Sequence, residues 1–355
     1  MRSCSSSHVE QDGSSMTSFM TSLMNRYIVL GIAALAAPAC SIEPPRQIDD
    51  EPLMQMQGAG LQGIVLQGNL VQGMTMSGFR FAGATRNGAA LSSFRLENGE
   101  LVGVQSAVTL RGTALVNTHL FAEARNNNVH PPQSAVIEYR ITAIAAEAPM
   151  YDPTHTGNTF LYTLEQNVDN TGTWQPACAA DHDGQRVAIP LADVWDDRGN
   201  RNSSAPLFTL ACTTSSIAEC YRWGYRPWVT GFGNLQITHW ACTRLARADY
   251  CGDGVSHTVD GTMINVWDNL APPGPIQAQG TTPPGMSFEA AWDQTGALCL
   301  SHPRWAFNGS VVAAACPNKL HPPGQGFPSV CDNATEGMMV GGGPIRLFNE
   351  SAINP

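Results

Sequence analysis

Lysine is almost absent from this sequence: Lys319 is the only one, and arginine supplies the remaining basic side chains. Charged residues make up 14% of the 355 residues, and the net charge is −10. The charges that precede Cys40 cancel, so the chain from Cys40 onward has the same net charge. Binding to nucleic acid phosphates requires a basic surface. The composition therefore argues against a nucleic acid partner.

Several motifs with known chemistry are missing as well. The ten cysteines form no Cys-x-x-Cys pair and no Cys/His spacing of a zinc site. A phosphate-binding glycine loop, Gly-x-Ser-x-Gly and His-Glu-x-x-His are also missing. We therefore expect neither a cofactor nor a metal.

A long apolar run is missing too, since the run at residues 27–37 is shorter than a membrane span. Preceded by Arg26, it has signal-peptide length. Leu35-Ala36-Ala37-Pro38-Ala39-Cys40 then resembles a bacterial lipobox, with Cys40 as the lipidated first residue. Two alternatives stay open: ordinary cleavage after the small-x-small run 37–39, which gives a secreted protein, or a retained helix.

We expect the chain to begin with a signal region at residues 1–39, whose true start is Met1, Met16, Met20 or Met24. Ser41 follows Cys40 where an aspartate would favour the inner membrane, so we expect an outer-membrane or cell-surface location. Residues 40–55 are rich in proline and acidic side chains, which is typical of an exposed tether.

A five-residue period follows the tether. It resembles a pentapeptide-repeat coil, in which one apolar residue per repeat points inward. We expect a β-type coil that packs on the next segment, because so few repeats cannot bury their own faces; a flexible glycine-rich segment is the alternative. The six units are Met56-Gln57-Gly58, Leu61-Gln62-Gly63, Leu66-Gln67-Gly68, Val71-Gln72-Gly73, Met76-Ser77-Gly78 and Phe81-Ala82-Gly83.

Strand patterns continue after the repeat. Residues 90–96 and 101–110 flank Asn98-Gly99, which is a type I′ hairpin signal. Residues 135–145 predict another strand. We therefore assign residues 56–148 to a small all-β unit of repeat and hairpin.

Residues 149–355 differ in composition, since they contain all eight tryptophans. An even number of cysteines after Cys40 in an exported chain predicts a disulfide framework, and the sequence leaves the pairing open. These cysteines are Cys178, Cys212, Cys220, Cys242, Cys251, Cys299, Cys316 and Cys331.

Short elements of both kinds are expected in this second domain. Strand patterns occupy residues 207–212, 288–292 and 297–300, and residues 271–284 form a loop rich in proline and glycine. Ser216-Ile217-Ala218-Glu219 is a capping box that opens a short helix ending at Gly224. The fold class is therefore predicted to be α+β: a small all-β unit followed by a disulfide-rich mixed domain.

One stretch of this domain concentrates most of its signals. Apolar residues at helical spacing predict a helix over residues 238–250, with Thr238 as N-cap and Gly252 just past its end. Arg244 and Arg247 fall outside the apolar face. Residues 255–259 and 263–267 flank Asp260-Gly261, which predicts a hairpin.

Ala248-Asp249-Tyr250-Cys251 lies inside Ala-Cys-Thr-Arg-x-x-Arg-Ala-Asp-Tyr-Cys-Gly-Asp-Gly-x-Ser-His-Thr, residues 241–258. This run resembles the signature of the ADYC-domain family. The resemblance covers roughly residues 160–331, including 208–212 and 221–228. It implies an envelope lipoprotein of a kind found mainly in myxobacteria and their relatives, and it implies no particular activity.

Two catalytic hypotheses can be framed from this stretch. Cys251 and His257 could act as a thiol nucleophile and its base, although a disulfide on Cys251 is expected instead. Asp249, Asp253 and Asp260 with His257 could form a general acid–base cluster. The structural alternative, which we favour, makes Asp253 and Asp260 turn residues, pairs Asp249 with an arginine or backbone amides, and places His257 on a strand face with Val255 and Val259.

Two further groups have a binding and a structural interpretation. Residues 193–200 carry enough oxygen ligands for calcium but lack the spacing of an EF-hand, so a solvated acidic turn is expected. The tryptophans could line a carbohydrate groove, but so many of them more often build a core.

Three functions are compatible with these observations. The first is a non-enzymatic lipoprotein that binds or scaffolds at the cell surface, held to the membrane by Cys40, with a protein or glycan as a further partner. The second is an envelope hydrolase or transferase on glycan or peptidoglycan that uses the Asp/His cluster. The third is a secreted matrix component. We favour the first, and an open cleft containing His257 and an aspartate within mutual reach would favour the second.

Overall fold

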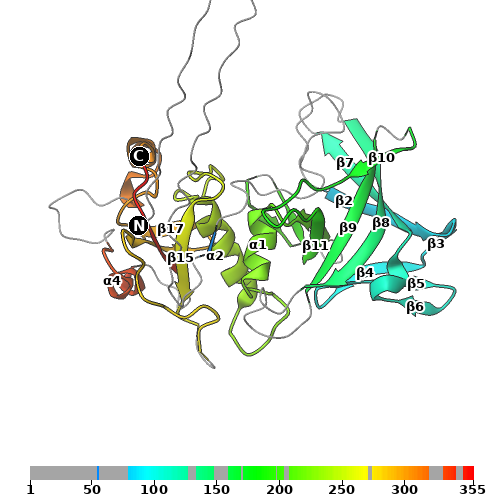
Figure 1. The fold of residues 1–355 in the computed structure, drawn as a ribbon, viewed down its shortest axis with the longest axis horizontal. Coiled ribbons are helices and arrows are strands. Elements are labelled where there is room, and N and C mark those ends of the chain that lie inside the picture. Colours follow the sequence, from blue (N-terminus) through cyan, green and yellow to red (C-terminus); the bar gives the residue numbers. More distant parts are fainter. Residues whose placement is uncertain are drawn as a thin grey trace, which may run out of the picture. The chain divides into compact units, whose positions relative to one another are not determined.

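A large antiparallel sheet occupies the first half of the folded chain (Figure 1). Its strand order is β14-β11-β9-β8-β7-β2-β3, and β10 pairs with β9. The computed structural model describes residues 54–55, 79–126, 133–147, 159–168, 171–196, 198–203, 208–270, 274–319, 331–340 and 347–355. The strands are β2 (Phe79–Arg86), β3 (Ala89–Ala90), β7 (Thr118–Asn126), β8 (Gln133–Ala146), β9 (Phe160–Val168), β10 (Thr173–Pro176), β11 (Val187–Ala192) and β14 (Phe208–Cys212).

The signal region, Cys40, the tether up to residue 53 and the repeat up to residue 78 lie outside the described residues. The last repeat unit, residues 81–83, is part of β2. The predicted strands 135–145 and 207–212 are confirmed as β8 and β14. Because β8 and β9 pair with each other, one sheet contains strands from both sides of the change in composition near residue 149.

A three-stranded sheet of β4 (Ser93–Glu97), β5 (Glu100–Gln105) and β6 (Val108–Leu110) packs on the large sheet. Its first turn is the predicted Asn98-Gly99 hairpin, with φ values of 48° and 82°. A Cβ on Gly99 would lie 2.2 Å from the Tyr221 hydroxyl, so only glycine fits there. The single strand expected at 101–110 is divided by a turn at residues 106–107 into β5 and β6. The short helix η1 (Gly112–Leu115) follows and contributes Leu115 to the shared core.

A second antiparallel sheet has the order β1-β15-β18-β16-β17. The strands predicted at 288–292 and 297–300 are confirmed as β16 and β17, which pair with each other in an antiparallel hairpin. The hairpin predicted around Asp260-Gly261 is wrong: residues 255–259 form no strand, and β15 pairs with β18 and β1. The strands are β1 (Met54–Gln55), β15 (Met263–Asp268), β16 (Ser287–Asp293), β17 (Gly296–Leu300) and β18 (Leu347–Ser351).

Two helices pack against each other, and each also covers one of the sheets (Figure 1). Ile217 of α1 (Ser216–Arg222) shares a buried cluster with Ile189 of the large sheet. Leu245 of α2 (Leu235–Arg247) shares another with Trp292 of the second sheet. Two further helices, α3 (Asn308–Ala315) and α4 (Ala334–Met339), and the short 3-10 helix η3 (Pro317–Lys319) lie in the C-terminal part. None of the helices in the described ranges is long and apolar enough to cross a membrane.

The helix ends differ from the prediction. The N-cap of α2 is Asn234, whose side chain accepts a hydrogen bond from Ile237 N, and Thr238 lies inside the helix. Ala248 ends α2 with φ 51°, where Gly252 was expected to terminate the helix. The capping box at the start of α1 is also wrong, since Ser215 is the N-cap and no side chain caps the helix.

The chain is thus mostly β, with four α-helices in its described part and four disulfides. All eight cysteines after Cys40 are paired, with Cα–Cα distances of 5.5 to 5.8 Å that are normal for disulfides. Each bridge contributes about 2–4 kcal/mol of stability. The pairs are Cys178–Cys212, Cys220–Cys242, Cys251–Cys316 and Cys299–Cys331.

Candidate functional site

The loop Ala248-Asp249-Tyr250-Cys251 leaves the C-terminus of α2 in the middle of the second core. Ala248 adopts the left-handed conformation, and the N–H groups of Ala248 and Asp249 donate to Leu245 O and Arg244 O. These bonds satisfy carbonyls at the helix end. The loop therefore leaves α2 in a direction set by backbone hydrogen bonds.

Asp249 forms a buried ion pair with Arg244. Arg244 Nη1 and Gly254 N both donate to Asp249 Oδ2, the latter at 3.0 Å. Burial raises the pKa of Asp249, and the attraction of Arg244 opposes that rise. The carboxylate thus holds the Gly-Asp-Gly turn against the last turn of the helix.

Arg244 and Arg247 are both buried, which corrects the expectation that they lie outside the packed face. Arg244 Nη1 donates to Arg198 O at 2.9 Å, and Arg244 Nη2 donates to Asn200 Oδ1 at 3.0 Å. Arg247 Nη2 donates to Gly254 O at 2.7 Å. Burial of these guanidinium groups is compensated because backbone carbonyls and side-chain oxygens of neighbouring turns accept their hydrogen bonds.

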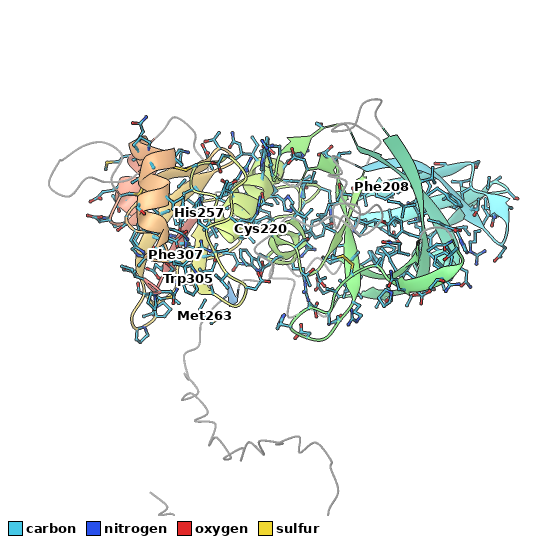
Figure 2. The ribbon with its side chains drawn as sticks, turned by 90° about the horizontal axis from the view of Figure 1, so that it is seen from above. Phe208, Cys220, His257, Met263, Trp305 and Phe307 are labelled. Carbon is cyan, nitrogen blue, oxygen red and sulfur yellow. A yellow bond between two sulfur atoms is a disulfide. The ribbon has the colours of Figure 1, made fainter. Side chains whose placement is uncertain are left out.

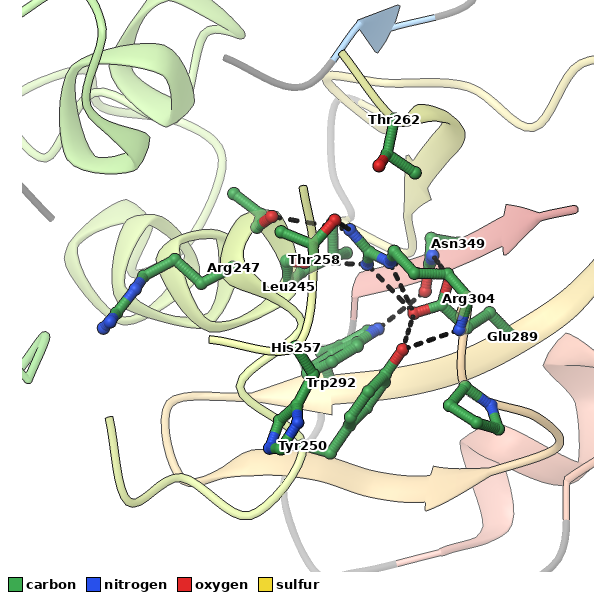
Figure 3. A network of polar contacts seen from close by, with 12 residues as sticks. Leu245, Arg247, Tyr250, His257, Thr258, Thr262, Glu289, Trp292, Arg304 and Asn349 are labelled. Atoms are coloured by element: carbon green, nitrogen blue, oxygen red, sulfur yellow. Dashed lines mark hydrogen bonds and ion pairs between the residues drawn. The ribbon is translucent and has the colours of Figure 1, made fainter. Parts of the chain in front are cut away.

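Tyr250 lies at the centre of a buried polar network (Figure 3). Its hydroxyl donates to Glu289 Oε1 at 3.0 Å and accepts from Arg304 N at 3.0 Å. Burial raises the pKa of Tyr250 well above its ordinary value, and the negative charge of Glu289 acts in the same direction. The hydroxyl therefore stays neutral and joins two charged residues.

Glu289 and Arg304 form an ion pair in which both side chains are fully buried. Arg304 Nη2 donates to Glu289 Oε1 and to Leu245 O, both at 2.9 Å, and Asn349 Nδ2 donates to Glu289 Oε2 at 2.7 Å. The ladder between β16 and β18 is irregular between Phe288 and Ala290, that is, at Glu289. Such a bulge redirects a side chain, here toward the network.

Sequence reasoning missed Glu289, Arg304 and Asn349. One signal was present, since Glu289 stands alone among apolar residues in Ser-Phe-Glu-Ala-Ala-Trp. A charged side chain at such a position needs a buried partner. Its partner Arg304, however, lies in an irregular segment whose position no sequence period indicates.

The ring of Tyr250 is stacked with two other rings (Figure 3). Its centroid lies 5.7 Å from that of His257 and 5.4 Å from that of Trp292. His257 is 5% exposed, while Val255 and Val259 are 50% and 48% exposed. The expectation that these three share one strand face is wrong, because the segment is irregular and His257 N donates to Arg247 O.

The structure does not bring the proposed acid–base residues together. Asp249 is held by Arg244, and Asp253 is an exposed turn residue whose Oδ1 accepts from Val255 N at 2.9 Å. Asp260 is exposed at its turn. Among the described residues no carboxylate lies within ion-pair distance of the His257 ring; the histidine–carboxylate pairs are His119–Glu138 and His182–Asp183.

Cys251 is bonded to Cys316, so its sulfur is not the free thiol that the nucleophile hypothesis requires. Each of the four motif residues therefore has a structural role. Ala248 ends the helix in the left-handed conformation, Asp249 forms an ion pair, Tyr250 joins the buried network and Cys251 forms a disulfide. The polar groups of the motif thus interact with other groups of the protein.

The residues considered for calcium form a turn between β12 (Val194–Trp195) and β13 (Arg201–Asn202). Asp196 Oδ1 accepts from Arg198 N and Asn200 N at 2.9 and 2.8 Å, and Asp193 pairs with Arg201. Asp197 lies outside the described residues. Within the part of the chain that the structure describes, no group of three or more His, Cys, Asp or Glu side chains is placed to hold a metal ion.

The tryptophans serve mainly in packing. Trp195, Trp267 and Trp292 are almost fully buried, in three different clusters. The guanidinium of Arg140 lies 4.4 Å from the ring centroid of Trp174. Trp305 is partly exposed.

Comparison with known proteins agrees with the motif. Residues 112–306 match the family model of the ADYC domain. The match begins in η1, includes β7 to β17 and ends just after Arg304, so it contains strands of both sheets and most of the Tyr250 network. No curated protein and no solved structure matches the chain.

Proposed function

The chain belongs to the ADYC domain family, and we propose that it is an exported, lipid-anchored protein of the cell envelope whose ADYC domain is a non-enzymatic binding or scaffold module. The observation that carries the proposal is the pairing of all eight cysteines after Cys40 into four disulfides. Disulfides persist in oxidising compartments and are rare in a reducing cytosol. An exported chain is therefore the consistent interpretation.

The N-terminal sequence supports export and adds the anchor. A signal-peptide-length apolar run ends at the lipobox-like residues 35–40, and the acidic, proline-rich stretch that follows suits a tether. In this proposal the acyl chains on Cys40 hold the protein in the outer membrane.

The structural use of the motif supports a role without catalysis. Asp249 and Cys251 are engaged in an ion pair and a disulfide, and Tyr250 joins Glu289 to Arg304. General acid–base chemistry requires a group within reach of a substrate proton. A rigid body that presents its surface to a protein or glycan partner fits these contacts better.

The proposal is tested on protein purified from the membrane fraction of its natural host. Mass spectrometry of the N-terminus should find a chain that begins with an acylated Cys40, and the Cys40→Ala variant should lack the acyl group. Thiol labelling of the denatured, unreduced protein should find almost no free cysteine. An unmodified Cys40, a chain that still carries residues 24–39, or stoichiometric labelling of Cys251 would contradict the proposal.

A further inference from the structure

The segment 305–315, Trp-Ala-Phe-Asn-Gly-Ser-Val-Val-Ala-Ala-Ala, contains no charged residue, yet it lies on the surface. Of the residues in α3 only Asn308 and Val312 are buried. Phe307 is 61% exposed and Val311 is 51% exposed. A surface helix of a soluble protein ordinarily presents charged or polar side chains to water. This segment presents apolar ones, which marks an interaction surface.

Neighbouring elements extend this surface into one patch, which we call the Trp305 patch: Met263, Trp305, Phe307, Val311 and Ile353. The rings of Trp305 and Phe307 lie 5.9 Å apart between centroids, and Val311 follows Phe307 by one helical turn. Met263 and Ile353 are 38% and 58% exposed. Figure 2 shows Met263, Trp305 and Phe307 in one region of the molecule.

Contacts between elements hold the patch together. Trp305 Nε1 donates to the hydroxyl of Thr262 at 3.2 Å, which places Trp305 beside Met263. A bridge between Trp305 and Asn354 places it beside Ile353. The indole therefore has a polar end that is hydrogen-bonded and a ring that is partly exposed. Trp side chains with this character are enriched where membranes meet water.

The tether enters the folded body at this patch. Strand β1 is the first described element after Cys40, and its Gln55 pairs with Met263. The stretch from Cys40 to Met54 can span at most roughly 50 Å when fully extended. An acyl anchor on Cys40 therefore keeps the Trp305 patch within that distance of the membrane surface.

We propose that the Trp305 patch is a membrane-contact surface that rests on the lipid surface to which Cys40 is anchored. This inference rests on the proposed anchor. The patch inserts Phe307, Val311 and the ring of Trp305 at the boundary of headgroups and acyl chains, as interfacial helices do. A short acyl tether alone would leave the body free to tumble, and this second contact orients it on the membrane.

The test uses the purified native protein and vesicles of phosphatidylethanolamine and phosphatidylglycerol that contain phospholipids brominated near the headgroup. Bromine quenches tryptophan emission only at short range. We expect partial quenching in the wild-type protein and its loss in Trp305→Phe. The double variant Phe307→Ser/Val311→Ser should also lose it, while Val108→Ser/Val136→Ser, at two valines exposed elsewhere, should keep it.

The melting temperatures of the four proteins are compared first, so that a loss of quenching is interpreted only for folded protein. Thr262→Val removes the hydrogen bond of the indole but keeps the aromatic rings, so it serves as a second control for Trp305→Phe. Quenching that persists in Trp305→Phe or in the Phe307→Ser/Val311→Ser variant would overturn the proposal. So would a dimer in sedimentation that the Phe307→Ser/Val311→Ser variant disperses, because the occupant would then be a second copy. Absence of quenching in protein with an acylated Cys40 overturns the patch alone. An unmodified Cys40 overturns the lipid anchor alone, because quenching by added vesicles still tests whether the Trp305 patch contacts lipid.

Discussion

Removing the hydroxyl of Tyr250 tests the network most sharply, because one atom accounts for two buried hydrogen bonds. Tyr250→Phe keeps the ring that stacks with His257 and with Trp292. It removes the donor to Glu289 and the acceptor for Arg304 N, both at 3.0 Å. An unsatisfied buried N–H costs about 1–3 kcal/mol, and a hydrogen bond to a charged group is worth about 1.5–3 kcal/mol. We expect a loss of about 3 kcal/mol in the free energy of unfolding.

The assay is urea unfolding under non-reducing conditions, with Tyr225→Phe as the matched control. Tyr225 is equally buried, but the only hydrogen bond of its hydroxyl among the described residues is to Asp268 Oδ2 at 3.1 Å, so its loss should be about half as large. A double-mutant cycle with Glu289→Gln should show coupling of about 1 kcal/mol or more, because the two side chains are in contact. A loss below about 0.5 kcal/mol for Tyr250→Phe would refute the reasoning.

Two further predictions concern pH and backbone space. Burial lowers the pKa of His239 from the ordinary 6.5 to about 4, so His239 stays neutral in the folded protein at a pH where the unfolded chain is protonated. The free energy of unfolding should therefore fall by about 3 kcal/mol as the pH drops from 6.5 to 4. The His239→Gln variant should flatten this part of the stability–pH curve. Gly252→Ala should destabilise the protein by more than about 2 kcal/mol, because φ is +71° and a Cβ would lie 1.9 Å from Thr295 O. Gly184 has a similar φ of +77° but no atom within 4 Å of the added Cβ, so Gly184→Ala should cost about 1–2 kcal/mol. Equal losses at Gly252 and Gly184, or an unchanged curve for His239→Gln, would contradict these two accounts.

The parts of the fold that sequence reasoning predicted correctly are those set by neighbours along the chain. The turn at Asn98-Gly99 is fixed by two residues that tolerate positive φ, and the flanking strands follow from it. Apolar and β-branched residues indicate strand β8 in the sequence, and a short polar turn between two apolar runs indicates β16 and β17. The pairing of all the later cysteines followed from their even number and from the expectation that the chain is exported.

The helix ends and the turn at residues 106–107 were missed for local reasons, whereas the larger errors come from contacts between distant segments. Residues 255–259 look like a hairpin partner for β15, but β18 takes that position from the other end of the chain. Arg244 looks like a solvent-facing residue in the sequence, but its guanidinium donates to Arg198 O, which lies 46 residues away. The ion pair of Glu289 and Arg304, which Tyr250 joins, depends on such contacts. The motif Ala248 to Cys251 therefore identified where the network lies but not the residues that complete it.

The most direct test of the claim that the motif region builds the fold, and does not catalyse, is the His257→Ala variant measured for melting temperature and for hydrolysis of peptidoglycan and polysaccharide. The ring stacks on Tyr250 and is 5% exposed. Its removal should destabilise by about 2 kcal/mol, from the lost stacking and buried area. We predict a lower melting temperature and no difference in hydrolysis from the wild-type protein. An unchanged melting temperature together with the loss of a measurable hydrolytic activity would contradict the account and establish an enzyme.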